Sequence, residues 1–163
     1  MTSSTAASEL TLVFEPIPPA VLEELRTAGV DEAGNTLAAE TDADGGNPLR
    51  CCLRETRPGE RVLLMAYTPP GGQGAYAERG PVFIRADQCD GYLTSDLYPP
   101  GLAHRQQVVR AYDWRGRIAD GVLAADGEHA TAIIRELFAS PDVSLVQLRN
   151  VGFGCYNCSV RRG

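Results

Sequence analysis

The residues of this sequence whose types are best suited to chemistry are its five cysteines, because thiolates bind soft metal ions, attack electrophiles and exchange with disulfides. They are Cys51, Cys52, Cys89, Cys155 and Cys158. A structural zinc site needs four ligands and usually takes them from two C-x-x-C pairs, whereas only Cys155 and Cys158 form such a pair here. Neighbouring side chains on a strand point to opposite faces, so we expect Cys51 to face away from Cys52. The metal or redox candidates are therefore Cys52, Cys89, Cys155 and Cys158; zinc is the cofactor such a set would hold, but this spacing does not favour it.

Other roles for these thiols stay open. A redox C-x-x-C pair sits at a helix N-terminus, where the helix dipole lowers the thiol pKa, but Cys155 follows Gly-Phe-Gly and precedes a predicted strand. A nucleophile such as Cys52 or Cys89, activated by His104, would need the fold to bring the two side chains together. Free cysteines also pack as small hydrophobic residues, and this is the favoured interpretation.

A Gly-rich loop, residues 69–80 (PPGGQGAYAERG), is the second candidate region. Glycine lets backbone N–H groups approach a ligand, but no Gly-Lys-Ser/Thr sequence follows, so this is not a nucleotide-binding P-loop. Binding residues concentrate on loops, so a ligand site is predicted here with Tyr76, Glu78 and Arg79, to which His104 is added.

The composition excludes several classes of protein. The chain has 163 residues, of which 44% are hydrophobic and 22% charged, as in one globular domain. Its net charge of −6 argues against binding to nucleic acid, and no apolar run is long enough for a membrane span. The first residues lack a signal peptide, and an odd number of cysteines does not suit a disulfide framework. We therefore expect a cytoplasmic protein with no nucleic-acid or membrane partner, whose small-molecule or protein partner is unknown.

Periodicity and turn signals predict an α+β fold with a single domain: a largely antiparallel sheet built from hairpins, with two short helices packed on it. The turn Arg57-Pro58-Gly59-Glu60 predicts a hairpin, and Asp126 is placed to cap the second helix. Residues 1–8 are predicted to be a flexible tail, residues 9–163 the domain, and residues 31–47 an acidic loop. The predicted strands are residues 10–17, 49–54, 61–67, 81–86, 106–113, 117–123, 143–150 and 156–161, and the predicted helices are 18–28 and 128–139.

Several spaced segments resemble one known family. They are PLRCCLRETRPGERVLLMAY, AYAERGPVFIRADQC, VVRAYDWRGRI and SLVQLRNVGFGCYNCSVRR, in that order. Together they resemble the bacterial family catalogued as domain of unknown function 1203, from about residue 10 to the C-terminus. That family's first motif is often Pro-Cys-Arg-x-Cys-Leu; here Leu49 stands where the earlier cysteine would be and Cys52 matches the later one. The resemblance implies no reaction or ligand, because the family itself is uncharacterised.

Two classes of function follow. The first, which is favoured, is a small binding or interaction domain with its ligand near residues 69–80. The alternative is a thiol-dependent protein with a structural zinc site, redox activity or a cysteine nucleophile, so whether the protein is an enzyme stays open. The second class predicts that at least three of the sulfurs of Cys52, Cys89, Cys155 and Cys158 lie in contact.

Overall fold

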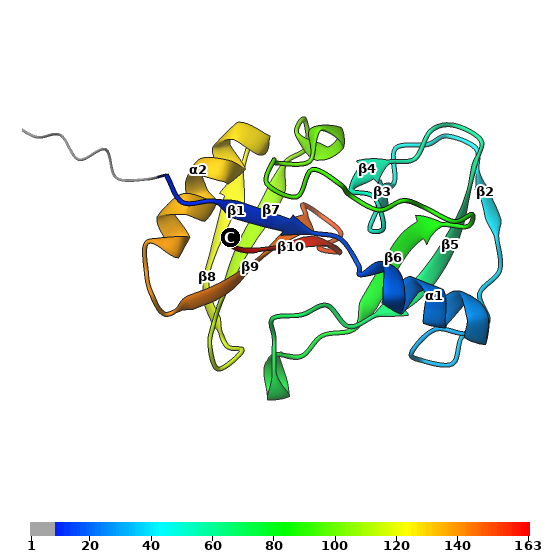
Figure 1. Ribbon diagram of the computed structural model, residues 1–163, viewed down its shortest axis with the longest axis horizontal. Coiled ribbons are helices and arrows are strands. Elements are labelled where there is room, and N and C mark those ends of the chain that lie inside the picture. Colours follow the sequence, from blue (N-terminus) through cyan, green and yellow to red (C-terminus); the bar gives the residue numbers. More distant parts are fainter. Residues whose placement is uncertain (1–8) are drawn as a thin grey trace, which may run out of the picture.

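The computed structural model describes residues 9–163, so the predicted tail 1–8 lies outside the described residues. The chain forms two five-stranded sheets that lie side by side (Figure 1). Strands pair mostly in antiparallel fashion, and two helices pack on them, which confirms the predicted α+β class.

The first sheet has the order β1-β10-β9-β7-β8, and all its pairs are antiparallel. Its strands are β1 (Leu12–Glu15), β7 (Gln107–Asp113), β8 (Ile118–Ala124), β9 (Val143–Asn150) and β10 (Tyr156–Arg162). Helix α2 (Gly127–Phe138) covers one face, and the Asp126 carboxylate caps it by accepting a hydrogen bond from the His129 N–H at 2.9 Å. Ile134 and Phe138 of α2 pack with Val109 and Leu148 in the buried core of this half.

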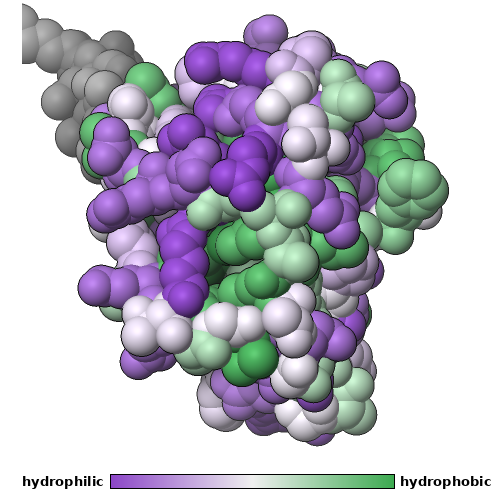
Figure 2. All heavy atoms as spheres, turned by 90° about the vertical axis from the view of Figure 1, so that its right-hand side faces the viewer, coloured by the Kyte–Doolittle hydropathy of each residue, from purple (hydrophilic) through white to green (hydrophobic). Residues whose placement is uncertain are grey.

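The second sheet has the order β2-β5-β6-β3-β4. Its strands are β2 (Glu40–Asp42), β3 (Pro48–Leu49), β4 (Arg54–Glu55), β5 (Glu60–Tyr67) and β6 (Gly80–Arg85). Helix α1 (Pro19–Ala28) buries Leu22 against this half, and the short 3-10 helices are η1 (Gly74–Tyr76) and η2 (Pro100–Leu102). Figure 2 shows a hollow on the face of this half, with hydrophobic residues at its floor and hydrophilic residues around it.

One predicted hairpin is wrong. The turn at residues 57–60 is present, with the Glu60 N–H donating to the Arg57 carbonyl at 3.1 Å, but it leads from β4 into β5 without pairing the two. Strand β5 pairs with β2 and β6, while β3 pairs with β4 and, in parallel, with β6. The predicted strand 49–54 is thus two short strands with a turn between them, and strand β2 comes from the acidic segment 31–47.

Arg50 joins the two halves. Its side chain is buried, and its Nε donates to the Tyr156 carbonyl of β10 at 2.7 Å while another guanidinium nitrogen donates to the Pro48 carbonyl. Burial lowers the pKa of Arg50 to about 10, so the guanidinium stays charged at neutral pH. The rings of Tyr67 and Tyr156 also meet across this junction, with centroids 5.9 Å apart.

Candidate metal centre

The turn between β3 and β4 brings two adjacent thiols together. Residues 50–53 form this turn, which is closed by a hydrogen bond from the Leu53 N–H to the Leu49 carbonyl at 3.0 Å. The sulfurs of Cys51 and Cys52 therefore lie 3.9 Å apart. The expectation that Cys51 faces away from Cys52 is wrong, because alternation of side chains applies to a strand and these residues are in a turn.

A strained backbone conformation completes this turn. Among residues 9–163, Leu53 is the one non-glycine residue with positive φ, at 56°. The left-handed region costs such a residue about 1–2 kcal/mol. The buried Leu53 side chain, packed in the core under α2, holds the backbone in place. Packing of the Leu53 side chain thus offsets the conformational cost of the backbone that brings the two thiols together.

Cys89 supplies a third sulfur from the segment that follows β6. The sulfurs of Cys51, Cys52 and Cys89 all lie within 4.8 Å of one another. Backbone N–H groups fix two of them, since Arg85 donates to the Cys51 sulfur at 3.3 Å and Gly91 donates to the Cys89 sulfur at 3.4 Å. We call these three residues the thiol cluster.

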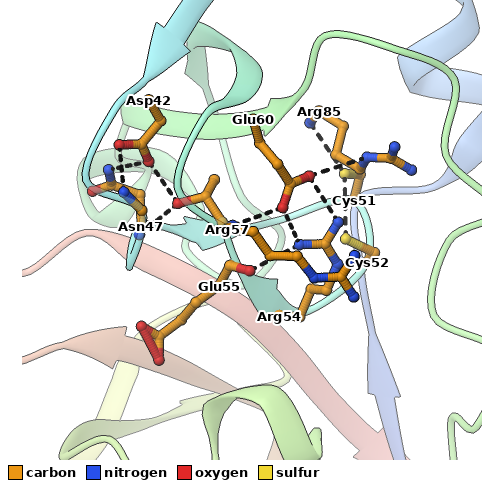
Figure 3. Close-up of polar contacts among 11 residues, drawn as sticks. Asp42, Asn47, Cys51, Cys52, Arg54, Glu55, Arg57, Glu60 and Arg85 are labelled. Atoms are coloured by element: carbon orange, nitrogen blue, oxygen red, sulfur yellow. Dashed lines mark hydrogen bonds and ion pairs between the residues drawn. The ribbon is translucent and has the colours of Figure 1, made fainter.

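Arginine side chains lie on one side of the thiol cluster. Figure 3 shows Arg54, Arg85 and Glu60 beside Cys51 and Cys52. Arg54 forms a two-pronged pair with Glu60, with N–O distances of 2.6 and 2.9 Å, and Arg85 lies 3.7 Å from the same carboxylate. Two guanidiniums thus share one carboxylate, which leaves an excess of positive charge next to the sulfurs.

The two adjacent thiols have opposite pKa shifts. The hydrogen bond from Cys52, helped by the Arg85 N–H, the Cys89 thiol and the charge of Arg26, lowers the pKa of Cys51 to about 6 against the opposing effect of burial. The same hydrogen bond and burial raise the pKa of Cys52. Cys51 is therefore the group that carries the first negative charge of the cluster.

The cluster opens to solvent on one side. Cys51 is buried, whereas Cys52 and Cys89 are partly exposed. Cys89 lines a surface pocket together with residues of α1, among them Glu23 and Arg26, and with Gln88. A small ion can approach through this pocket, while the buried Cys51 sulfur is closed to a large substrate.

The other two cysteines lie elsewhere. Cys158 is fully buried in the core of the first sheet, where burial raises its thiol pKa to about 12. Cys155 is partly exposed and lines a cavity of about 140 Å³ with Arg149 and Phe153. The prediction that at least three of the sulfurs of Cys52, Cys89, Cys155 and Cys158 lie in contact is therefore wrong, because only Cys52 and Cys89 of this set belong to the thiol cluster and its third member is Cys51.

The predicted ligand-site residues divide as well. Glu78 and Arg79 line the cavity that contains Cys155 and Arg149, while Tyr76 is exposed on η1. The His104 side chain contacts the Glu55 carboxylate of β4 and is largely exposed. Two of the three predicted loop residues, Glu78 and Arg79, therefore share one cavity, whereas Tyr76 and His104 lie outside it.

Sequence reasoning missed Cys51 and Arg26. The pattern Leu-Arg-Cys-Cys-Leu-Arg predicts a strand, in which Cys51 would face away from Cys52. A turn whose left-handed residue is leucine lacks the glycine or asparagine that usually marks such a turn. Arg26 lies on α1, where its guanidinium donates to the Arg85 and Asp87 carbonyls at 2.7 and 3.3 Å. No local signal connects it to a thiol 25 positions away.

Within residues 9–163, no helix has the length and apolar character that crossing a membrane requires. Comparison with protein families matches residues 46–162 to the family described as Protein of unknown function (DUF1203). This match covers more than half of the chain and includes every residue of the thiol cluster. Neither the curated proteins nor the solved structures gave a match.

Proposed function

The chain belongs to the DUF1203 family, whose function is unknown, and from its thiol cluster we propose that it is a small binding domain for one soft metal ion, held by Cys51, Cys52 and Cys89. The observation that carries the proposal is the convergence of three sulfurs from two separate segments to within 4.8 Å.

The spacing of the sulfurs suits a thiolate-bound ion. Zinc–sulfur bonds of about 2.3 Å place tetrahedral sulfur ligands about 3.8 Å apart. The Cys51 and Cys52 sulfurs are already 3.9 Å apart, and the sulfur of the partly exposed Cys89 lies within 4.8 Å of both. The site is thus close to its ligand-bound geometry before an ion arrives.

The charges around the cluster also suit a thiolate site. A metal binds the thiolate form, so each protonated thiol must lose its proton when the ion enters. Cys51 has a lowered pKa and needs little help, and the excess positive charge of Arg54 and Arg85 balances part of the charge on the remaining sulfurs. Three thiolates with a divalent ion carry a charge of −1, which these guanidiniums accommodate.

Thiolate ligands select ions such as zinc and copper(I). Zinc would take the three sulfurs plus a water or substrate in a fourth position, as in open zinc sites, while copper(I) is another soft ion that thiolates bind. The shared chemistry is a soft ion in a sulfur-rich shell, and the experiment below separates the two ions.

Disulfide chemistry fits the cluster less well. A disulfide needs Cα atoms about 4.4–6.8 Å apart, whereas adjacent residues have Cα atoms about 3.8 Å apart, so a bond between Cys51 and Cys52 would be strained. The lowered-pKa thiol is the buried one, out of reach of a protein disulfide. The burial and charge of the thiol cluster therefore suit metal binding better than thiol–disulfide exchange.

The test is metal titration of the reduced, metal-stripped protein. We expect one equivalent of cobalt(II), a spectroscopic substitute for zinc, to produce a sulfur-to-metal charge-transfer band. The affinity for copper(I) is measured separately, by competition with a colorimetric chelator. Cys51→Ser, Cys52→Ser and Cys89→Ser should each weaken binding at least ten-fold, while Cys155→Ser serves as the matched control and should bind as the wild type does. Binding that is absent, or that falls equally in Cys155→Ser, would contradict the proposal.

We further propose that the protein is cytoplasmic. All five cysteines are free, and an oxidising compartment would not preserve an odd-numbered set of unpaired thiols. Cell fractionation with thiol counting tests this, and recovery from a secreted fraction with blocked thiols would contradict it.

A further inference from the structure

A second set of polar side chains lies on the face of the first sheet opposite α2. Arg110 of β7 is paired in register with Gln147 of β9, and Arg149 lies two residues further along β9. Arg149 is nine-tenths buried, yet it is a charged side chain on a rigid central strand. Such a group needs a partner, because burying an unpaired charge is costly.

The strands hold both guanidiniums in place independently of any loop carboxylate. Arg149 donates to the Gln147 side-chain oxygen at 2.6 Å and to the Gly154 carbonyl at 2.9 Å. Arg110 donates to the Tyr112 hydroxyl at 3.4 Å, and that hydroxyl donates to the same Gln147 oxygen at 3.3 Å. The two arginines are therefore preorganised by neighbours on β7 and β9 and by the turn before β10.

The Gly-rich loop, residues 69–80, supplies the carboxylate that the two arginines share. Glu78 accepts from Arg110 at 2.8 Å with one oxygen and from Arg149 at 3.0 Å with the other. The Glu78 side chain is 43% exposed, so it approaches the buried Arg149 from the solvent side. Two guanidiniums that bind the two oxygens of one carboxylate match the geometry of oxyanion recognition.

Few polar contacts attach this loop to the rest of the protein. Beyond Glu78, the Gln147 side chain donates to the Pro70 carbonyl at 2.7 Å and the Gln73 N–H donates to the Gly116 carbonyl of the β7–β8 hairpin at 3.0 Å. Arg79 pairs with Glu32 at 3.7 Å, and Gly71 lies against Tyr112. Figure 1 shows the loop reaching from β5 towards that hairpin and back to β6. The binding groups thus lie on rigid strands, whereas their carboxylate lies on a solvent-exposed loop with several glycines.

From this arrangement we propose that Arg110 and Arg149 form a binding site for an external oxyanion, a carboxylate or a phosphate, and that Glu78 occupies the site when the ligand is absent. The external anion replaces Glu78, and the Gly-rich loop moves away from the first sheet. The cavity of about 140 Å³ beside Arg149 can hold the few ligand atoms that are attached to the oxyanion group. No covalent step is involved, since one ion pair is exchanged for another.

The proposal makes Glu78 a competitor. A site that Glu78 closes in roughly nine molecules out of ten, or more, binds a free anion at least about ten-fold more weakly than the open site does. Removal of the Glu78 carboxylate should tighten binding at least ten-fold. Glu32 provides the matched control, because it pairs with Arg79 at 3.7 Å on the same loop, and its removal changes the net charge equally.

The experiment is a titration of the folded full-length protein with succinate and, separately, with inorganic phosphate, at constant ionic strength. Binding is followed by the arginine Nε–Hε signals in ¹H–¹⁵N NMR spectra. We expect saturable binding that is at least ten-fold tighter in Glu78→Ala than in the wild type and in Glu32→Ala, and that is lost in Glu78→Ala combined with Arg110→Met. Arg110 is the more exposed of the two arginines, so this variant tests the site without emptying the buried position.

Each outcome decides the matter. Preference for succinate or for phosphate would assign the class of oxyanion. Equal affinities in the wild type and Glu78→Ala, equal gains in Glu78→Ala and Glu32→Ala, or binding that survives Arg110→Met would overturn the proposal. The thiol cluster takes no part in this titration, so its metal binding stands or falls separately.

Discussion

Replacing Gly72 by alanine should detach the Gly-rich loop without unfolding the rest of the protein. A methyl group added at Gly72 would lie 2.0 Å from the Tyr76 carbonyl oxygen and 2.7 Å from its carbonyl carbon, both of them backbone atoms that cannot turn aside. Helix η1 therefore cannot form in the variant. Neither buried core cluster contains a residue of this loop, so the damage should stay local. Tyr112 and Leu145, which lie against Gly71, are the buried side chains that would gain exposure.

The magnitude follows from the contacts that would be lost. Two turn hydrogen bonds, Tyr76 N–H to Gln73 at 3.0 Å and Ala77 N–H to Gly74 at 3.1 Å, are lost first. The bonds that join the loop to the first sheet, from Gln147 to Pro70 and from Gln73 to Gly116, are lost if the loop lifts. At about 1 kcal/mol each, the free energy of unfolding should fall by about 4 kcal/mol. The partly exposed ion pairs of Glu78 add little, about 0–1 kcal/mol each.

Denaturant unfolding and hydrogen exchange together provide the assay. We expect the amides of Tyr76 and Ala77 to lose protection in Gly72→Ala, while the amides of β5 and β6 keep theirs. Gly80→Ala is the matched control, because nothing lies within 4 Å of the added methyl and its backbone is not in the left-handed region; its stability should stay within about 0.5 kcal/mol of the wild type. Unchanged protection of residues 73–78 in Gly72→Ala would refute the reasoning.

Three further predictions concern stability. Hydrogen bonds, first of all from the Ala66 N–H and then from Asn35 and Ala33, lower the pKa of Asp31 to about 2. The contribution of Asp31 to stability is therefore present above its ordinary pKa of 3.8 and is lost as the pH falls towards 2. Asp31→Asn should lower the melting temperature at pH 7 and flatten the decline of the melting temperature between pH 4 and pH 2, and an unchanged decline would contradict this. Asp126→Ala removes the cap of α2 and should lower the free energy of unfolding by about 1 kcal/mol in denaturant unfolding. A decrease too small to measure would contradict this. Ile134→Ala empties a fully buried position under α2 and should cost about 2–5 kcal/mol by the same measurement, whereas a cost below 1 kcal/mol would show that the core there is loosely packed.

Regular elements were largely predictable from the sequence, because their signals are local. The helix at residues 127–138 combines an aspartate cap with apolar residues at helical spacing, and the hairpin of β7 and β8 has a turn at Arg115 and Gly116 between two strand-like runs. The class of the fold followed from these elements. What local signals could not fix was the pairing of strands far apart in sequence, such as β3 with β6 or β1 with β10.

The site was less predictable for a specific physical reason. The sequence identified the cysteines, but the thiol cluster depends on a turn that has leucine in the left-handed conformation, and its cost is offset by burial of Leu53 in a core built from the other sheet. Likewise, Glu78 could be assigned to a loop, whereas its partners Arg110 and Arg149 come from strands more than 30 and 70 positions away. Tertiary packing, which single-sequence patterns do not contain, selects both sets of partners.

The most direct test of the central claim, a soft metal ion bound by Cys51, Cys52 and Cys89, is X-ray absorption at the zinc edge of protein loaded with one equivalent of zinc. The account predicts three sulfur neighbours at about 2.3 Å, falling to two in Cys89→Ser and staying at three in Cys155→Ser. A first shell that contains only oxygen and nitrogen, or one that loses sulfur in Cys155→Ser, would contradict it.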